Sequence, residues 1–294
     1  MSSLDDRIAR MAGTLYIVST PIGNLEDITH RAVRVLGEVD LIACEDTRHT
    51  RKLLNHHGIN TKTISYHEHN ERERTWELLR LLNSGSDVAI VSDAGTPGIS
   101  DPGFRVVQAA IEQGVQVVPL PGPTAFVSAL IASGLPSDEF FFGGFLPARS
   151  GARRARLLKL RSSPGTLIFY DAPHRIAATL KDAYEILGER KAVIARELTK
   201  MHEEIARGRL SDLAARFSSA QSARGEIVLI IDRTAIQGEI EEHEVAGNVS
   251  AQVAAFEAKG MDHRAALKKA ARELGLSRAE AYRRLIAERS SQKS

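Results

Sequence analysis

Residues 87–103 read DVAIVSDAGTPGISDPG, and this stretch decides the fold. Its first part is a short apolar run of the kind that predicts a buried β-strand. The remainder, residues 92–103, is too rich in glycine and proline to lie inside a helix. We therefore predict a strand that ends in a loop. For Gly95–Ile99 we favour ligand binding, whereas the later residues also fit a helix start capped by Ser100 or Asp101.

Two further loops of this type flank the first along the chain. They read STPIGNLED at 19–27 and PLPGPTAFVSAL at 119–130. Taken alone, loop 19–27 is better explained as an ordinary strand–helix turn than as a ligand-binding loop, since it lacks the GxGxxG pattern. Loop 119–130, taken alone, fits helix capping and ligand binding equally well. Because parallel strands end at one edge of a sheet, the three loops together predict one ligand site. Asp93 and Asp101 are candidate hydrogen-bond acceptors there.

Short apolar runs alternate with amphipathic segments through residues 1–134, which predicts an α/β domain with a mostly parallel sheet. In one of these segments, Trp76, Leu79 and Leu82 are expected to share one face of a helix. The predicted strands of this domain are 14–20, 39–43, 61–65, 87–92 and 115–120.

A second α/β domain is predicted at 135–236, after a loop with several glycines and prolines. Residues 191–210 resemble two strands joined directly, which favours an antiparallel hairpin and hence a mixed sheet. The predicted strands are 166–171, 191–197, 203–210 and 225–232, with FFFGG as an opening strand. Residues 245–290 form a helical unit with a break at 275–277, the outline of a helix-turn-helix.

The overall composition predicts a soluble cytoplasmic protein. Lys and Arg total 39 against 37 Asp and Glu, so any nucleic-acid binding has to come from local clusters. The single cysteine, Cys44, excludes an internal disulfide and suits a reducing compartment. We find neither a signal-peptide pattern nor an apolar run of the roughly 20 residues that cross a membrane.

The three loops, in this order, resemble the tetrapyrrole methylase superfamily. Within it, the sequence is most similar to the members that methylate a ribose 2′-hydroxyl in small-subunit ribosomal RNA. Further strings extend this resemblance across residues 13–232: CEDTR (44–48), GFLP (144–147), FYDAPHRI (169–176) and ARELTKMHEE (195–204). The resemblance implies a two-domain fold, S-adenosylmethionine in the cleft between the domains, a homodimer, and a cytidine of the 16S rRNA decoding region as the target.

Carried over position by position, the resemblance implies a set of cofactor-binding residues, with Gly225 as a further candidate. They are Pro21, Gly95, Thr96, Pro97, Ile99, Thr124, Ala125, Asp171, Leu198 and Thr199. The loop at 92–103 departs from the Gly-Asp-Pro form of the porphyrin-directed members, which makes a tetrapyrrole a less favoured substrate.

Methyl transfer to a hydroxyl needs in-line placement and a base that removes the proton. Glu45 and Asp46 follow the second predicted strand, and His67 and Glu68 follow the third. We favour Asp46 as the base, with Glu45 as the alternative and Arg48 as a residue that binds phosphate or orients the carboxylate. Helix capping with an internal Arg pair explains the two carboxylates about equally well. The spacing predicts no metal site.

Two basic segments predict RNA binding. Residues 148–161 contain several arginines and no acidic residue, and the helical C-terminal unit is also basic. A solvated helix face and a purely structural helical unit are the respective alternatives. The candidate RNA-binding residues are Arg149, Arg153, Arg154, Arg156, His174, Arg175, Lys268, Arg283 and Arg284.

Two other functions are compatible with parts of the sequence. One is methylation of a porphyrinoid or of diphthine by another branch of the superfamily, and the basic segments argue against both. The other is a nucleic-acid-binding regulator that only senses S-adenosylmethionine. Intact loops and the carboxylates at Glu45 and Asp46 argue against that regulator.

Overall fold

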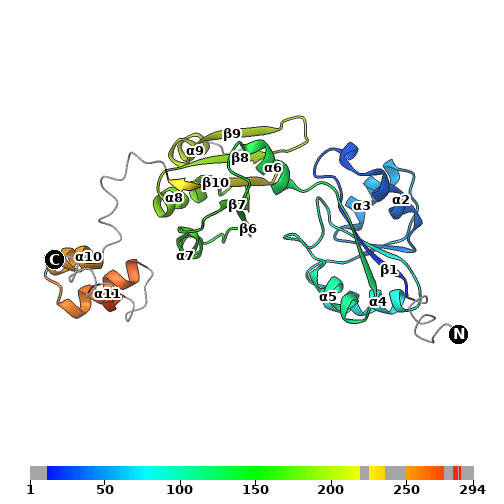
Figure 1. Cartoon of the computed structure of the whole chain (residues 1–294), viewed down its shortest axis with the longest axis horizontal. Coiled ribbons are helices and arrows are strands. Elements are labelled where there is room, and N and C mark those ends of the chain that lie inside the picture. Colours follow the sequence, from blue (N-terminus) through cyan, green and yellow to red (C-terminus); the bar gives the residue numbers. More distant parts are fainter. Residues whose placement is uncertain (1–11, 219–224, 236–248, 275–280, 284, 286–294) are drawn as a thin grey trace.

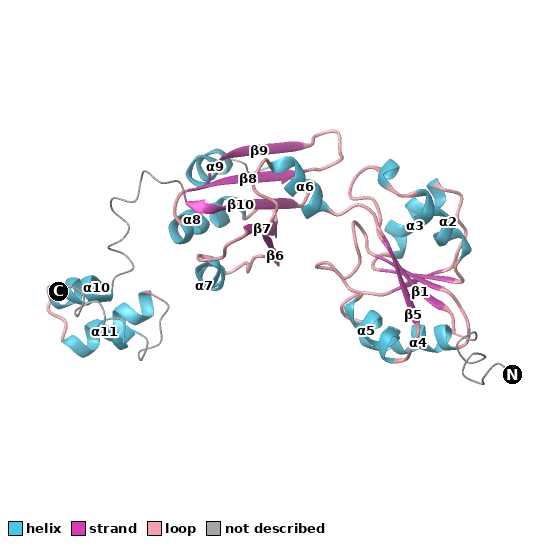
Figure 2. Ribbon diagram, viewed as in Figure 1, coloured by secondary structure: helices cyan, strands magenta, loops and turns pink. Residues whose placement is uncertain are grey.

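A computed structural model of the chain describes residues 12–218, 225–235, 249–274, 281–283 and 285. Two five-stranded sheets, each covered by helices, form the body of the molecule (Figures 1 and 2). The α/β fold predicted from the sequence, with a parallel and a mixed sheet, is confirmed.

The first sheet is parallel, with strand order β3-β2-β4-β1-β5. Its strands are β1 (Thr14–Val18), β2 (Leu41–Cys44), β3 (Thr63–Ser65), β4 (Val88–Val91) and β5 (Gln116–Leu120). The central strands are continuous apolar runs because helices cover both faces of the sheet. One face is covered by α2 (His30–Glu38) and α3 (Thr47–His56), and the other by α4 (Glu71–Asn83) and α5 (Phe104–Glu112).

The prediction that Trp76 lies on the buried face of α4 is wrong. The Trp76 side chain is 62% exposed, whereas Leu79 and Leu82 are buried. The buried face of α4 runs through Thr75, Leu78, Leu79 and Leu82. Each residue turns a helix by about 100°, so Trp76 projects away from the centre of that face.

The second sheet is mixed, with strand order β6-β7-β10-β8-β9. β6 runs parallel to β7, while β10 is antiparallel to both β7 and β8, and β8 and β9 form the predicted antiparallel hairpin. The strands are β6 (Phe140–Phe145), β7 (Thr166–Asp171), β8 (Arg190–Arg196), β9 (Glu204–Arg209) and β10 (Ile227–Ala235).

Helices cover this sheet on both faces too. Helices α7 (Ser150–Leu160), α8 (Ile176–Leu187) and α9 (Leu210–Phe217) pack on one face. Helix α6 (Ala125–Ser133) follows β5 of the first sheet in the chain, yet it packs on the opposite face of the second sheet through Ala129 and Leu130. The segment 119–124 thus connects the two domains.

Helices α10 (Val249–Glu257) and α11 (His263–Glu273) pack on each other around a small apolar core of their own. The predicted helix break at 275–277 lies outside the described residues. Within the part of the chain that the structure describes, we find no helix long and apolar enough to cross a bilayer.

Candidate active site

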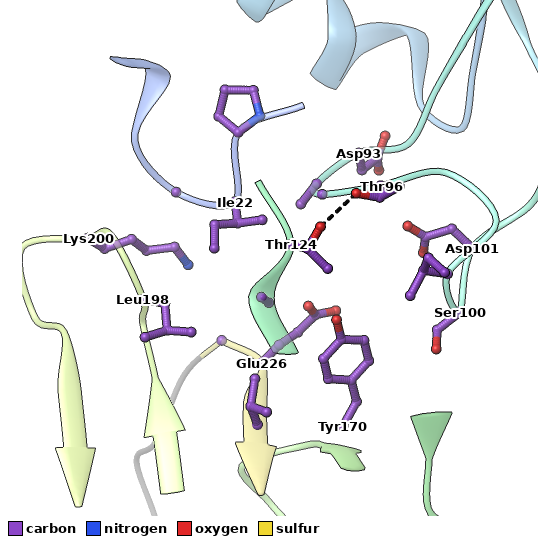
Figure 3. A pocket seen from close by; sticks show the side chains of 18 of the residues that line it. Ile22, Asp93, Thr96, Ser100, Asp101, Thr124, Tyr170, Leu198, Lys200 and Glu226 are labelled. Atoms are coloured by element: carbon purple, nitrogen blue, oxygen red, sulfur yellow. Dashed lines mark hydrogen bonds between the residues drawn. The ribbon is translucent and has the colours of Figure 1, made fainter. Parts of the chain in front are cut away.

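Three loops meet at the carboxyl edge of the first sheet and are tied together by hydrogen bonds. The Thr20 amide donates to the Gly95 carbonyl over 2.8 Å, and the Gly95 amide donates back over 3.0 Å. The Thr96 hydroxyl then lies 3.0 Å from the Ser19 hydroxyl. It lies 2.8 Å from the Thr124 hydroxyl (Figure 3). Thr96 therefore joins all three loops, and they converge on one edge, as the sequence predicted.

Gly95 sits at the centre of this arrangement because its backbone is left-handed, with φ of 84°. Residues with a Cβ rarely adopt that conformation. A Cβ at this position would also lie 3.5 Å from Ile22 and 3.8 Å from the Pro123 carbonyl oxygen. The glycine thus lets the chain turn back toward the first loop.

A turn at 197–200 of the second domain forms the opposite wall. It contacts the first loop so closely that a Cβ on Gly23 would lie 2.9 Å from the Leu198 carbonyl oxygen. Glu197 and Thr199 both have positive φ, 50° and 65°, an uncommon conformation for residues other than glycine. Such conformations persist only where the surrounding structure holds them, and they are frequent at ligand sites.

Between these walls lies a cleft of about 670 Å³. Seven predicted cofactor-binding residues line it: Pro21, Gly95, Thr96, Ile99, Thr124, Ala125 and Leu198. Gly225 lines it as well. Pro97, Asp171 and Thr199 do not belong to its lining.

Asp171 is fully buried beside the site. Its Oδ1 accepts hydrogen bonds from the Arg175 guanidinium and from the Ala172 amide, while Oδ2 has no partner among the described residues. The carboxylate holds the start of the loop after β7 in place. The Arg175 guanidinium is thus engaged with a buried carboxylate, and RNA binding by Arg175 stays a prediction.

Five carboxylates line the cleft: Glu45, Asp93, Asp101, Glu197 and Glu226. Burial, assisted by neighbouring Glu45, raises the pKa of Asp101 to about 7. Burial and the nearby Asp93 raise the pKa of Glu45 above its usual value. The cleft therefore carries concentrated negative charge, which favours a cationic ligand, and at least one carboxyl that titrates near neutral pH.

Asp93 also fixes the start of α3. Its Oδ1 accepts a hydrogen bond from the Asp46 amide over 3.0 Å. Loop 92–103 and the end of β2 are thereby joined at the edge of the sheet where the cleft opens.

Asp46 lies outside the lining of the cleft and acts as the N-cap of α3. Its carboxylate accepts a hydrogen bond from the Arg48 amide over 2.8 Å and pairs with the Arg48 guanidinium. These bonds hold the pKa of Asp46 well below its usual range. A carboxylate so stabilised is a weak base, which favours the capping interpretation over catalysis for Asp46 and leaves Glu45 and Asp101 in the cleft.

The arginines of α7 are not free of acidic partners. Arg153 is buried and pairs with Asp182 of α8 over 2.6 Å, and it also donates to the Ala148 carbonyl. Arg154 pairs with Asp182 and Glu185. The prediction that Arg153 binds RNA is corrected because its side chain is buried, whereas RNA binding by the partly exposed Arg154 stays a prediction. The compensating acids were invisible in the sequence because they come from another helix.

The other predicted RNA-binding residues lie on the surface where the structure describes them. Arg149, Arg156 and His174 are exposed in the second domain, and Lys268 and Arg283 are exposed in the C-terminal helices. Arg284 lies outside the described residues.

Several lining residues were not predicted from the sequence. Tyr170 and Glu226 come from β7 and from the residue before β10, and Figure 3 shows their side chains next to each other. Burial raises the pKa of Tyr170 to about 12, so its hydroxyl stays protonated. His49, Lys52 and Lys200 also line the cleft. Strand β7 was recognisable, but no local pattern shows which strands of the second sheet face the first domain.

This fold and site define a class of protein. Residues 14–214 match the family model for tetrapyrrole (corrin/porphyrin) methylases, and the chain belongs to that family. It is similar over much of its length to proteins named ribosomal RNA small subunit methyltransferase I. One from Halalkalibacterium halodurans is 47% identical over 272 residues, covering 92% of this chain and 93% of that protein. One from Micromonospora olivasterospora is 54% identical over 220 residues, covering 75% of this chain and 70% of that protein.

Solved structures share the fold at lower identity. Uroporphyrin-III C-methyltransferase from Thermus thermophilus, complexed with S-adenyl homocysteine, has a TM-score of 0.54 at 22% identity and covers 75% of this chain and 97% of its own. A diphthine synthase has a TM-score of 0.60 at 15% identity, and the match covers 76% of this chain and 92% of that one. These similarities support the fold.

Proposed function

We propose that this protein transfers a methyl group from S-adenosylmethionine to a ribose 2′-hydroxyl in small-subunit ribosomal RNA, on a cytidine of the decoding region. The observation that carries the proposal is the cleft between the two domains, in a chain whose relatives are named for RNA methylation. The similarity to those relatives spans both walls of the cleft.

The residues present fit S-adenosylmethionine. A cleft of about 670 Å³ has the size of a small-molecule site. Its carboxylates suit a ligand that carries a sulfonium and an ammonium, and the buried Thr199 hydroxyl, beside the lining, has no partner among the described residues. Gly225, with φ of 83°, lets the Glu197 carboxylate lie against the backbone of the cleft wall, because a Cβ there would lie 1.8 Å from Glu197 Oε1.

When bound, this cofactor supplies a methyl group already made electrophilic by the sulfonium. The protein has to place the ribose in line and accept its proton. We assign proton acceptance to Asp101, which lines the cleft and has a pKa of about 7, close to the value that suits a base at neutral pH. Glu45 contributes by raising that pKa, because two neighbouring carboxylates resist simultaneous ionisation.

We further propose that the protein works in the cytoplasm as a homodimer. The supporting feature is an apolar surface formed by Val127 and Ile131 of α6 with Phe140 of the edge strand β6; their exposed fractions are 43%, 77% and 44%. The ring of Phe140 lies 6.2 Å, centroid to centroid, from that of Phe126 of α6, so the edge strand and the helix are neighbours there. Contiguous exposed apolar side chains are typical of interfaces. Light scattering after size exclusion would measure the mass.

The function is tested by incubating the protein with radiolabelled S-adenosylmethionine and either small ribosomal subunits or naked small-subunit rRNA. We expect label in the RNA, and alkaline hydrolysis should leave it in a resistant dinucleotide, the mark of a 2′-O-methyl group. Label in an alkali-sensitive product, or only in an added porphyrinoid, would contradict the proposal. Binding without any transfer would instead support a regulator.

A further inference from the structure

Helix α3 carries basic side chains at the mouth of the cleft. We propose that Arg48, His49 and Lys52, named here the α3 basic stripe, bind the phosphates that flank the target nucleotide. This inference rests on the proposed function, because it takes RNA as the substrate. It adds a phosphate-binding surface in the first domain to the two basic segments that the sequence predicted, 148–161 and the C-terminal helical unit.

The sequence of α3 has a single sign of charge. TRHTRKLLNH, residues 47–56, contains three Lys or Arg residues, two histidines and no acid. Arg48 and Lys52 are four residues apart, and His49 and Lys52 are three apart, so they share one side of the helix. The stripe is therefore a continuous basic surface along the first two turns.

The position of the stripe is set by the fold. Strand β2 ends at Cys44, and the hydrogen bond from the Asp46 amide to Asp93 places the first turn of α3 at the rim of the cleft. His49 and Lys52 both line the cleft, and the Arg48 side chain is 89% exposed. The stripe thus begins at the cleft and continues outward along the helix.

The stripe has donors available for a ligand. Among the residues that the structure describes, neither the Lys52 side chain nor the His49 side chain has a hydrogen bond or ion pair. Within the described part of the chain, the Arg48 side chain has Asp46 as its sole ion-pair partner, at an exposed position where an ion pair contributes little. Arg153 of α7, by contrast, is buried against Asp182 and cannot reach RNA without breaking that pair.

Charge is ordered along the cleft. The carboxylates Glu45 and Asp101 line the cleft, and the α3 basic stripe begins among the same lining residues with His49 and Lys52 and continues outside the lining with Arg48. A phosphodiester is repelled by the former and attracted by the latter. A nucleotide would therefore enter with its phosphates on α3 and its ribose toward the carboxylates, which is the orientation that 2′-hydroxyl methylation needs.

The test compares Lys52→Glu and Lys52→Gln with Lys191→Glu. Lys191 is an exposed lysine near the start of β8, whereas the cleft is lined by Ala195 near the end of that strand. Binding of naked small-subunit rRNA and of small subunits is measured by filter retention between 50 and 200 mM salt, together with KM and kcat for label transfer.

We expect both Lys52 variants to weaken RNA retention and to raise the KM for RNA, with the larger effect in Lys52→Glu. The RNA affinity of the wild-type protein should fall as salt rises over this range. Loss of one phosphate contact should make that fall about threefold smaller. Lys191→Glu should behave as wild type. Wild-type affinity and salt dependence in both Lys52 variants would overturn the inference while leaving the proposed function intact.

The two proposals can fail separately. If the wild-type protein transfers no label to RNA, the proposed function falls, whereas RNA binding that is weakened only in the Lys52 variants would still identify α3 as the binding surface. Absence of RNA binding by the wild-type protein would overturn both.

Discussion

Replacing Gly23 with alanine should separate the two walls of the cleft. The added Cβ would lie 2.6 Å from Lys200 Cγ, 2.9 Å from the Leu198 carbonyl oxygen and 2.9 Å from Thr199 Oγ1. The lysine side chain can move aside, but the backbone carbonyl and the buried hydroxyl belong to a turn with two left-handed residues. The turn therefore has to shift away from the first loop by several tenths of an ångström.

The size of the effect follows from the cost of overpacking, about 1–3 kcal/mol. Each wall has its own apolar core, so the strain can be relieved by moving the walls apart rather than by unfolding either one. A ligand that contacts both walls has to bring them together again. We expect the Kd for S-adenosylmethionine to rise about fivefold to a hundredfold, with a smaller change in Tm.

Titration calorimetry measures the Kd, and Gly37→Ala is the matched control. Gly37 lies in α2, and a Cβ there would meet no atom within 4 Å. Alanine should stabilise that helix by about 0.5–1 kcal/mol and leave cofactor binding unchanged. If Gly23→Ala bound S-adenosylmethionine as tightly as wild type, the contact between the first loop and the 197–200 turn could not contribute to the site.

Two further predictions concern charged residues. Asp101→Asn should slow single-turnover methyl transfer by about 100-fold to 10,000-fold, whereas Asp46→Asn should retain most of the rate, since Asp46 caps α3 outside the cleft. In the wild-type protein, kcat/KM should rise with pH through about 7, because Asp101 accepts a proton only when ionised; a rate independent of pH between 6 and 8 would remove it as the base. Arg153→Ala should lower the free energy of unfolding in urea by about 3 kcal/mol, because Asp182 stays buried after losing its main partner, while the RNA affinity of the folded protein is unchanged. If Arg153→Ala weakened RNA binding without lowering the free energy of unfolding, Arg153 would be an RNA-binding residue after all.

The sequence predicted the elements whose signals are local. Strand β4 is a run of apolar residues ended by glycine and proline, and its predicted position, 87–92, agrees with Val88–Val91. The convergence of the three loops follows from strand polarity alone. Seven of the ten cofactor-binding residues implied by the family resemblance line the cleft, because they lie on those loops or on the 197–200 turn.

Features that depend on contacts between distant segments were not predictable in this way. Arg153 and Asp182 are 29 residues apart, so the sequence around α7 shows basic residues without the acidic residue that pairs with them. Glu226 enters the cleft only because β10 pairs with β7 and β8. The exposure of Trp76 depends on which side of α4 packs on the sheet. The spacing of Trp76, Leu79 and Leu82 is compatible with more than one buried side, so the sequence did not determine it.

The packing of α6 has a consequence for how the two halves of the molecule communicate. Segment 119–124 leaves β5 of the first sheet and leads directly into a helix that is fixed on the second. A ligand that contacts Thr124 and Ala125 therefore binds at the end of the segment that connects the two domains. Val127 and Ile131 lie on the outer side of that helix, in the surface proposed for the homodimer. In that proposed dimer, cofactor binding and dimerisation should be thermodynamically linked, each strengthening or weakening the other by the same factor.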